Sequence, residues 1–164
     1  MKAGQPTSIK PIQLLLRLPV PWIFVLAYLI GVLLEYIFPF RADQDAARSI
    51  TNVAGITLFA VGAVIAGWAW TIFRRAGTTR VPGEVSATFV FWGPYRATRN
   101  PMYVGLALAY AGEALMLRQI WPILVLPFML VYLNWIVIPL EETRLREVFQ
   151  GRYDEYCTRV RRWF

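Results

Sequence analysis

Histidine is absent from the sequence, and cysteine occurs once, at Cys157. The missing histidine removes the commonest general base near neutral pH and the commonest metal ligand. A single cysteine excludes a disulfide within the chain and a metal site built from several thiolates. Proton transfer would therefore depend on carboxylates, tyrosine or arginine, and we expect no metal site.

Charged residues are also scarce. They make up 16% of the 164 residues, against about 25% in ordinary soluble domains. Hydrophobic residues reach 57% and aromatic residues 15%, which predicts an integral membrane protein. The net charge is +7. Because the arginines lie beside hydrophobic stretches, we expect membrane lipids with anionic headgroups as their partners, and no nucleic acid.

Hydrophobic stretches occur at about residues 20–38, 50–73, 102–117 and 120–140. A spanning helix takes about 20 apolar residues, and the third stretch approaches this length only if its helix begins at the Asn100-Pro101 turn. The sequence therefore predicts an all-α integral membrane bundle of about four transmembrane helices plus a C-terminal amphipathic helix.

We expect a single membrane domain over residues 1–164. Residues 1–73 would hold an N-terminal interfacial segment, at about Ile9–Leu18, and two spans. Residues 74–164 would hold a polar loop, a helical hairpin and the C-terminal helix. That last helix is predicted because apolar residues recur every three or four positions after the fourth span, and we expect a bend near Gly151.

Basic residues are concentrated on one side of the predicted bundle. All but Arg41, Arg48 and Arg118 of the 17 lie in the N-terminal segment, the central loop or the tail. By the positive-inside rule, the protein is multi-pass with both termini and the central loop on the cytoplasmic side.

The central loop contains a Gly-Pro turn at residues 93–94 and an Asn-Pro turn at residues 100–101. Proline suits the first helical position, so we expect the third helix to begin at Pro101, with its first amides facing an anionic group. Arg96 and Arg99 add positive charge with bidentate geometry. This loop could bind the anionic group of a ligand, or it could contact lipid phosphates and set the topology.

An acidic pair, Glu141 and Glu142, follows the fourth span directly. Its carboxylates could accept hydrogen bonds from an ammonium group or a ribose. Alternatively, they could form ion pairs on the helix surface, Glu142 with Arg146 and Glu141 with Arg144.

Two further acids, Glu35 and Glu113, lie inside hydrophobic stretches. Intramembrane acids are expensive and therefore candidates for a functional role. Both could instead lie near the outer interface, with Arg41 in reach of Glu35 and Arg118 in reach of Glu113.

Three motifs lie at defined spacings in the second half of the chain: Gly-Pro-Tyr-Arg-x-x-Arg-Asn-Pro-Met-Tyr-x-Gly at residues 93–105, Glu-Glu-x-x-Leu-x-x-x-Phe at residues 141–149, and a tail with Tyr153, Tyr156, Val160 and Arg162. Together they resemble the isoprenylcysteine carboxyl methyltransferase and phospholipid methyltransferase group. The resemblance covers about residues 74–164, while the first two spans are similar only in being hydrophobic.

Members of that group are integral membrane methyltransferases that use S-adenosylmethionine. The resemblance implies methyl transfer to a lipid-like, amphiphilic acceptor, first of all an isoprenylcysteine-like carboxylate. A phospholipid amine or a small thiol is the alternative within the group. Outside it, a small four-helix transporter using Glu35 and a scaffold without turnover remain open. A minimal transporter does not need the arginine-rich loop and the long tail, and Asn100 is the only feature that points to a scaffold.

Candidate site residues come from this resemblance and from the charges already noted. Arg99 and Glu142, both in the pocket that the resemblance implies, are the candidate catalytic residues. Arg96, as a cation of the central loop, and Glu113, as an intramembrane acid, are candidates for binding the substrate. The cofactor pocket would be formed by Arg99, Asn100, Pro101, Tyr103, Gly105, Glu141, Glu142 and Tyr153, with Tyr156 helping to cover it. The group usually has histidine where this chain has Asn100. Asparagine donates and accepts hydrogen bonds but is no base, which favours an acceptor that is already anionic.

Overall fold

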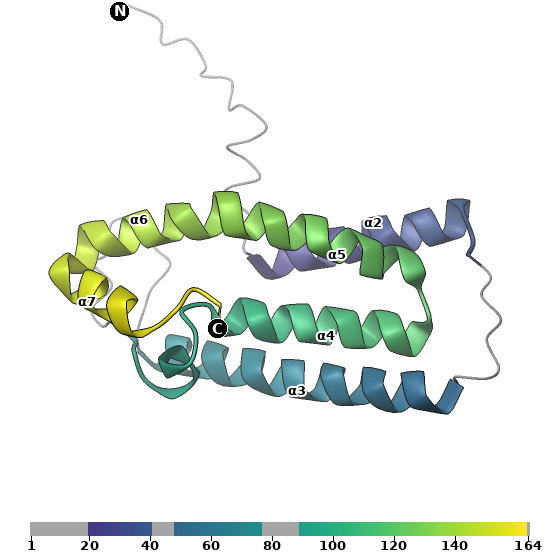
Figure 1. Ribbon diagram of the computed structural model, residues 1–164, viewed down its shortest axis with the longest axis horizontal. Helices are drawn as coiled ribbons and strands as arrows, with labels where there is room; N and C mark the ends of the chain where they lie inside the picture. Colours follow the sequence, from purple (N-terminus) through teal and green to yellow (C-terminus); the bar gives the residue numbers. More distant parts are fainter. Residues whose placement is uncertain (1–19, 41–47, 77–88, 164) are drawn as a thin grey trace, which may run out of the picture.

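The computed structural model describes residues 20–40, 48–76 and 89–163. These residues are almost entirely helical and contain no β-strand, which confirms the all-α prediction. The elements are α2 (Val20–Ile37), α3 (Arg48–Arg75), the 3-10 turn η1 (Gly93–Arg96), α4 (Pro101–Leu117), α5 (Ile120–Tyr132), the π-helical turn η2 (Leu133–Val137), α6 (Ile138–Phe149) and α7 (Gly151–Arg159) (Figure 1). The predicted interfacial stretch Ile9–Leu18 and the loop residue Arg41 lie outside the described residues.

Three helices in the described part of the chain are long and apolar enough to cross a membrane: Val20–Ile37, Ser49–Arg75 and Ile120–Phe149. Helix α4 begins at Pro101, as predicted, and has 17 residues. At about 1.5 Å per residue it is roughly 26 Å long, slightly less than the hydrocarbon core of a bilayer. The bundle thus has the spans of an integral membrane protein.

The last span is longer than the hydrophobic run that predicts it. Helices α5, η2 and α6 are continuous, so the helix passes through Glu141 and Glu142 and ends at Phe149. The expected bend occurs at Gln150, where φ is 48°. The acidic pair therefore lies on a rigid helix, and only α7 forms a separate C-terminal helix.

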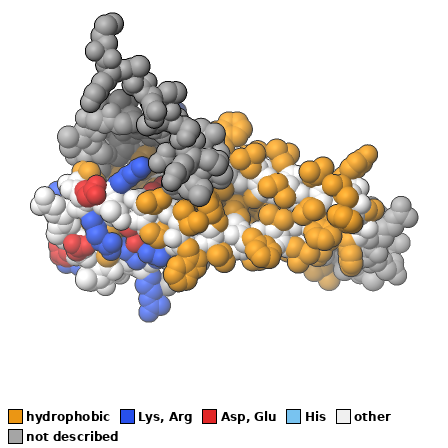
Figure 2. All heavy atoms as spheres, turned by 90° about the horizontal axis from the view of Figure 1, so that it is seen from above, with side chains coloured by type: hydrophobic (Ala, Val, Ile, Leu, Met, Phe, Trp, Pro, Cys, Tyr) orange, Lys and Arg blue, Asp and Glu red, His pale blue; other side chains and the backbone are white. Residues whose placement is uncertain are grey.

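Two helix pairs make up the bundle: α3 packs along α4, and α2 packs along α5 (Figure 1). Helix α4 also contacts α2 and α5, which joins the pairs around a core that includes Phe24, Tyr110 and Met129. Large apolar side chains such as Phe128 (77% exposed) face outward. Figure 2 shows hydrophobic side chains over the part of the visible face away from the α6–α7 end, and charged side chains gathered at that end. This distribution is expected where lipid is the solvent.

Glycines allow α3 and α4 to approach closely. Gly55 on α3 lies opposite Gly112 on α4, and Gly62 lies opposite Gly105. On each helix the two glycines are seven residues, or about two turns, apart. A Cβ on Gly105 would lie 2.5 Å from the amide nitrogen of Ala66. Small residues permit such close backbone packing in lipid, where apolar burial gives helices little reason to associate.

Glu35 connects the far ends of α2 and α5. Its carboxylate oxygens accept hydrogen bonds from the backbone amides of Phe40 and Trp121, each at 3.2 Å. The indole of Trp121 also donates to the carbonyl of Phe38 at 2.7 Å. A carboxylate at the first turn of a helix is stabilised by the helix dipole, so Glu35 has a structural role at this end.

The glycine contacts lead to a prediction about stability. Gly62→Ala would place a methyl group against the backbone of Ala109 and Gly105, whereas a methyl at Gly67 meets nothing within 4 Å. We expect Gly62→Ala to lower the free energy of unfolding by about 1–3 kcal/mol through overpacking. Gly67→Ala should be neutral or stabilising by up to about 1 kcal/mol. Unfolding in mixed micelles measures both, and equal effects would contradict the close approach of α3 and α4.

Candidate functional site at the charged end of the bundle

A buried carboxylate, Glu142, lies at the centre of the charged end. The residue is only 5% exposed. Its Oε1 lies 3.2 Å from Nη1 of Arg99. Arg162 makes a bidentate contact with the same carboxylate, with its Nε 3.1 Å from Oε1 and its Nη2 2.7 Å from Oε2. Such paired, charge-assisted hydrogen bonds fix the orientation of both groups. We call Arg99, Glu142 and Arg162 the ion cluster, which carries one net positive charge.

The surface ion pair considered for Glu142 is not present. Arg146 instead contacts Asp154 of α7 at 3.1 Å, and both side chains are about half exposed. Glu142 points inward to the ion cluster. Its hydrogen bond with Arg162 raises the pKa of that guanidinium above its already high ordinary value. Arg162 is therefore a fixed positive charge.

The C-terminal strip, residues 160–163, closes this end. The carbonyl of Arg162 accepts hydrogen bonds from Oγ1 of Thr98 and Nδ2 of Asn100, both at 2.9 Å. Asn100 thus ties the strip to the beginning of α4. The strip is held against the loop on one side and against Glu142 on the other.

The π-helical turn η2 explains why the strip also binds the last span. The amide of Ile138 donates to the carbonyl of Leu133, five residues earlier. In this register the carbonyl of Asn134 would pair with residue 139, which is proline and has no N–H. A π-turn of this kind often marks a functional position. Pro139 therefore leaves the carbonyl of Asn134 available to an external donor.

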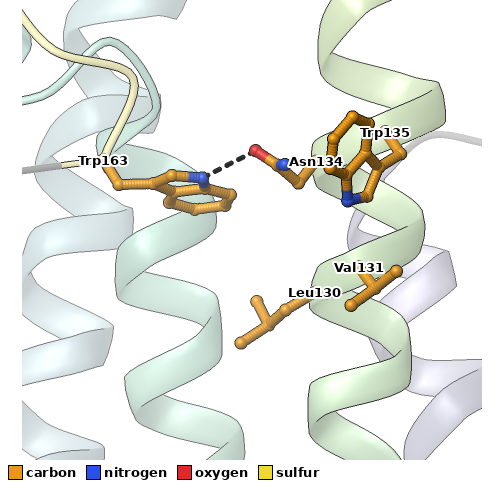
Figure 3. Close-up of a pocket in the computed structure, with 5 residues that line it drawn as sticks. All are labelled: Leu130, Val131, Asn134, Trp135 and Trp163. Carbon is orange, nitrogen blue, oxygen red and sulfur yellow. Dashed lines mark hydrogen bonds between the residues drawn. The ribbon is translucent and has the colours of Figure 1, made fainter.

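The strip supplies that donor. Nη1 of Arg162 lies 3.3 Å from the carbonyl oxygen of Asn134 and 3.4 Å from its side-chain oxygen. The indole of Trp163 donates to the same side-chain oxygen at 2.9 Å. Figure 3 shows this hydrogen bond between Trp163 and Asn134. Arg162 thus connects Glu142 to Asn134.

Arg99 has one further feature. Besides contacting Glu142, its Nη1 donates to Sγ of Cys157 at 2.7 Å. Its Nε is buried and has no hydrogen-bond partner in the described structure. An unsatisfied buried donor is costly unless a ligand or water completes it. Arg99 is consequently suited to an additional anionic oxygen.

The other half of the acidic pair faces a tyrosine. The hydroxyl of Tyr103 lies 2.7 Å from both carboxylate oxygens of Glu141. Burial, followed by the charge of Glu141, raises the pKa of Tyr95 to about 12. Burial also raises the pKa values of Tyr153 and Tyr156. These last three phenols stay protonated near neutral pH and cannot act as bases there.

Tyr153 is 2% exposed, packs against Phe89 and lies close enough to Glu142 and Arg99 for their charges to act on its phenol. The other predicted residues lie apart from the ion cluster. Gly105 faces α3 at the glycine interface. Arg96 is exposed at the end of η1. Glu113 lies twelve residues after Pro101 on α4, about 18 Å along the helix axis.

The structure thus brings together part of the predicted set. The charged end, around the start of α4 at the buried Pro101, brings together Arg99, Asn100, Tyr103, Glu141, Glu142 and Tyr153. The predicted site residues do not include Asn134, Arg162 or Trp163, which complete it. Pro139 was only a partial signal, because in an α-helix it would leave the carbonyl of Trp135 unpaired, and the π-turn shifts this position to Asn134.

In the described part of the chain, a helical bundle with three long apolar helices and a charged site at one end is the architecture of an integral membrane protein. The phospholipid methyltransferase family model matches residues 50–152, well over half of the sequence, so the chain belongs to that family. The match begins in α3, earlier than the motif resemblance at residue 74, and ends before the C-terminal strip. No match was found among curated proteins or solved structures. The protein is thus a membrane methyltransferase by family.

Removing the central carboxylate should destabilise this end. In Glu142→Ala, two arginines face each other without their shared anion, and we expect a loss of about 3 kcal/mol in the free energy of unfolding. Asp154→Ala removes only an exposed ion pair and should cost less than about 1 kcal/mol. Tryptophan fluorescence during chemical unfolding in micelles reports both changes. Equal losses in the free energy of unfolding would show that the buried ion cluster contributes no more to stability than the exposed ion pair.

Proposed function

We propose that the protein transfers a methyl group from S-adenosylmethionine to an amphiphilic acceptor in the membrane. The observation that carries the proposal is the ion cluster: Glu142 is held between Arg99 and Arg162 at the start of α4, in a chain of the phospholipid methyltransferase family. Opposite charges are thereby arranged in a site of low exposure, next to apolar spans.

The donor set fits the amino-acid end of the cofactor. A zwitterion requires a cation for its carboxylate and an anion for its ammonium group. Arg99 offers a buried Nε without a partner for the carboxylate. Glu141 and Glu142 offer carboxylates for the ammonium group. When bound, S-adenosylmethionine supplies an activated methyl group on a sulfonium centre.

The protein's own contribution is positioning. Rigid placement of Arg99 and Glu142 on two helix ends would hold the reacting groups in one orientation, which can supply a large share of a rate enhancement. The C-terminal strip covers the ion cluster and would limit the access of water. Asn100 acts here by binding the carbonyl of Arg162. No proton transfer by the protein is needed in this mechanism.

The lack of a general base at the site favours an acceptor that is already nucleophilic. The chain has no histidine, and the pKa values of the phenols of Tyr95, Tyr153 and Tyr156 are raised. The net positive charge of the ion cluster favours an anion. An isoprenylcysteine-like carboxylate meets both conditions, ahead of a phospholipid amine or a small thiol. Its carboxylate oxygen would form the new bond to the methyl carbon as the sulfonium–methyl bond breaks.

Sidedness is the second part of the proposal. The charged end carries Arg74, Arg75, Arg96 and the arginines of α6, α7 and the strip, whereas the described arginines of the other end are Arg48 and Arg118. This asymmetry supports a cytoplasmic location for the charged end, where S-adenosylmethionine is made. The transporter alternative loses support, because both oxygens of Glu35 accept backbone hydrogen bonds.

Calorimetry with S-adenosylmethionine tests the proposal. The protein in lipid nanodiscs should bind one cofactor per chain. Arg99→Gln should weaken the affinity at least about tenfold, or about 1.4 kcal/mol, because it removes the cation for the cofactor carboxylate. Arg144→Gln, an exposed change on α6, is the matched control and should bind like the unmodified protein. Absence of binding by folded, unmodified protein would overturn the proposed function.

A further inference from the structure

The last turns of α3 carry two arginines that border one hollow of the surface. Trp70, Thr71, Arg74 and Arg75 line this hollow, which has a volume of about 410 Å³. One water molecule takes roughly 30 Å³ in the liquid, so the hollow admits a much larger group. Trp70 and Arg74 are neighbours one turn apart on the helix, as are Thr71 and Arg75. Both arginines therefore face the same space at the end of a span.

Neither arginine forms an ion pair with an acid among the described residues, and both are exposed. The carboxylates that do form ion pairs at this end, those of Glu142, Asp154 and Glu155, have arginines of the central loop, α6, α7 and the strip as partners. The hydroxyl of Thr71 donates to the carbonyl of Gly67 at 2.7 Å and adds no charge. The hollow thus carries two positive charges that the described part of the chain does not balance.

Exposed tryptophans place this hollow at the membrane surface. Trp68, Trp70 and Trp92 are 54%, 41% and 40% exposed. Trp92 lies beside α3 because the next residue, Gly93, packs on that helix: a Cβ on Gly93 would lie 3.6 Å from Cζ2 of Trp68. Tryptophan is enriched where the hydrocarbon of a bilayer meets its headgroups. Arg74 follows Trp70 by four residues, about 6 Å along the helix axis, and so lies at the level of the headgroups.

The chemistry of the hollow selects an anionic phospholipid. A guanidinium group binds phosphate oxygens through paired N–H donors, and its contacts with an anion are stronger than those between neutral groups. A bilayer presents phosphates at this level. In a zwitterionic headgroup the lipid's own cation offsets the phosphate, whereas an anionic headgroup offers a charge that matches the unbalanced arginines.

We propose that Arg74 and Arg75 bind the phosphate of an anionic phospholipid, with Trp70 beside the glycerol part of the lipid. The site belongs to α3, whereas the ion cluster is formed by the start of α4, by α6 and by the strip. The inference does not depend on methyl transfer. Because α3 packs along α4 and also contacts η1, a lipid bound here stabilises the helix pair that positions the central loop (Figure 1).

Native mass spectrometry of the delipidated protein in micelles tests the site. Phosphatidylglycerol and phosphatidylcholine with identical chains are titrated separately, and the first bound lipid is counted. Each arginine near an anionic headgroup contributes roughly a factor of five, so we expect at least about tenfold tighter binding of phosphatidylglycerol. Arg74→Gln/Arg75→Gln should bind both lipids equally. Arg144→Gln/Arg152→Gln removes the same charge from exposed positions on α6 and α7 and should keep the preference.

Photolabelling of the unmodified protein locates the lipid without any variant. Phosphatidylglycerol with a photoactivatable group on its headgroup should label residues 70–75, and unlabelled phosphatidylglycerol should compete. Inorganic phosphate at the same concentration as the lipid should leave the labelling unchanged, because acyl chains do not hold free phosphate at the surface.

Three results would overturn the inference. Equal binding of the two lipids by the unmodified protein would remove the selectivity for an anionic headgroup. An equal loss of preference in both double variants would show that the attraction is spread over the whole charged end. Displacement of the lipid by an equal concentration of inorganic phosphate would assign the hollow to a soluble anion instead of a lipid.

Discussion

The buried carboxylate of Glu142 is the constraint on which the charged end depends. A carboxylate at 5% exposure beside a bilayer is tolerated only with strong partners, and Arg99 and Arg162 supply them at 3.2 and 2.7 Å. These partners come from the start of α4 and from the C-terminal strip. Three parts of the chain that are distant in sequence are thereby fixed around one anion, with no metal ligand cluster among the described residues.

The apolar part of the bundle obeys a different rule. Lipid removes most of the hydrophobic drive for helices to associate, so close contact depends on small residues. The glycines of α3 and α4 provide that contact, and Gly105 belongs to it. Tight packing of α4 against α3 fixes the position of Pro101 and of the loop before it. The glycine interface thus supports the ion cluster from a distance, although it touches none of its charges.

Local signals in the sequence predicted the helices well, and the Asn-Pro turn marked the start of α4. The resemblance grouped Arg99 with Glu142 in one pocket, and the structure brings these two side chains into contact, whereas their roles stay predictions. The hydrophobic run predicted that the last span ends at Leu140, because hydrophobicity gives no sign that Glu142 is paired and buried. The contacts of Arg162 with Thr98, Asn100 and Asn134 join residues 28 to 64 positions apart. Periodicity does not predict such contacts, so the position of the C-terminal strip and the contact of Trp163 with Asn134 required the structure.

Methyl transfer in the membrane is the activity that this arrangement of charges would serve. The most direct test supplies the protein in nanodiscs with S-adenosylmethionine carrying a labelled methyl group and an anionic amphiphile. The proposed mechanism predicts label in a product that partitions into organic solvent, with almost none for Arg99→Gln. Cofactor binding without label in a panel of amphiphilic carboxylates, phospholipid amines and thiols would contradict it.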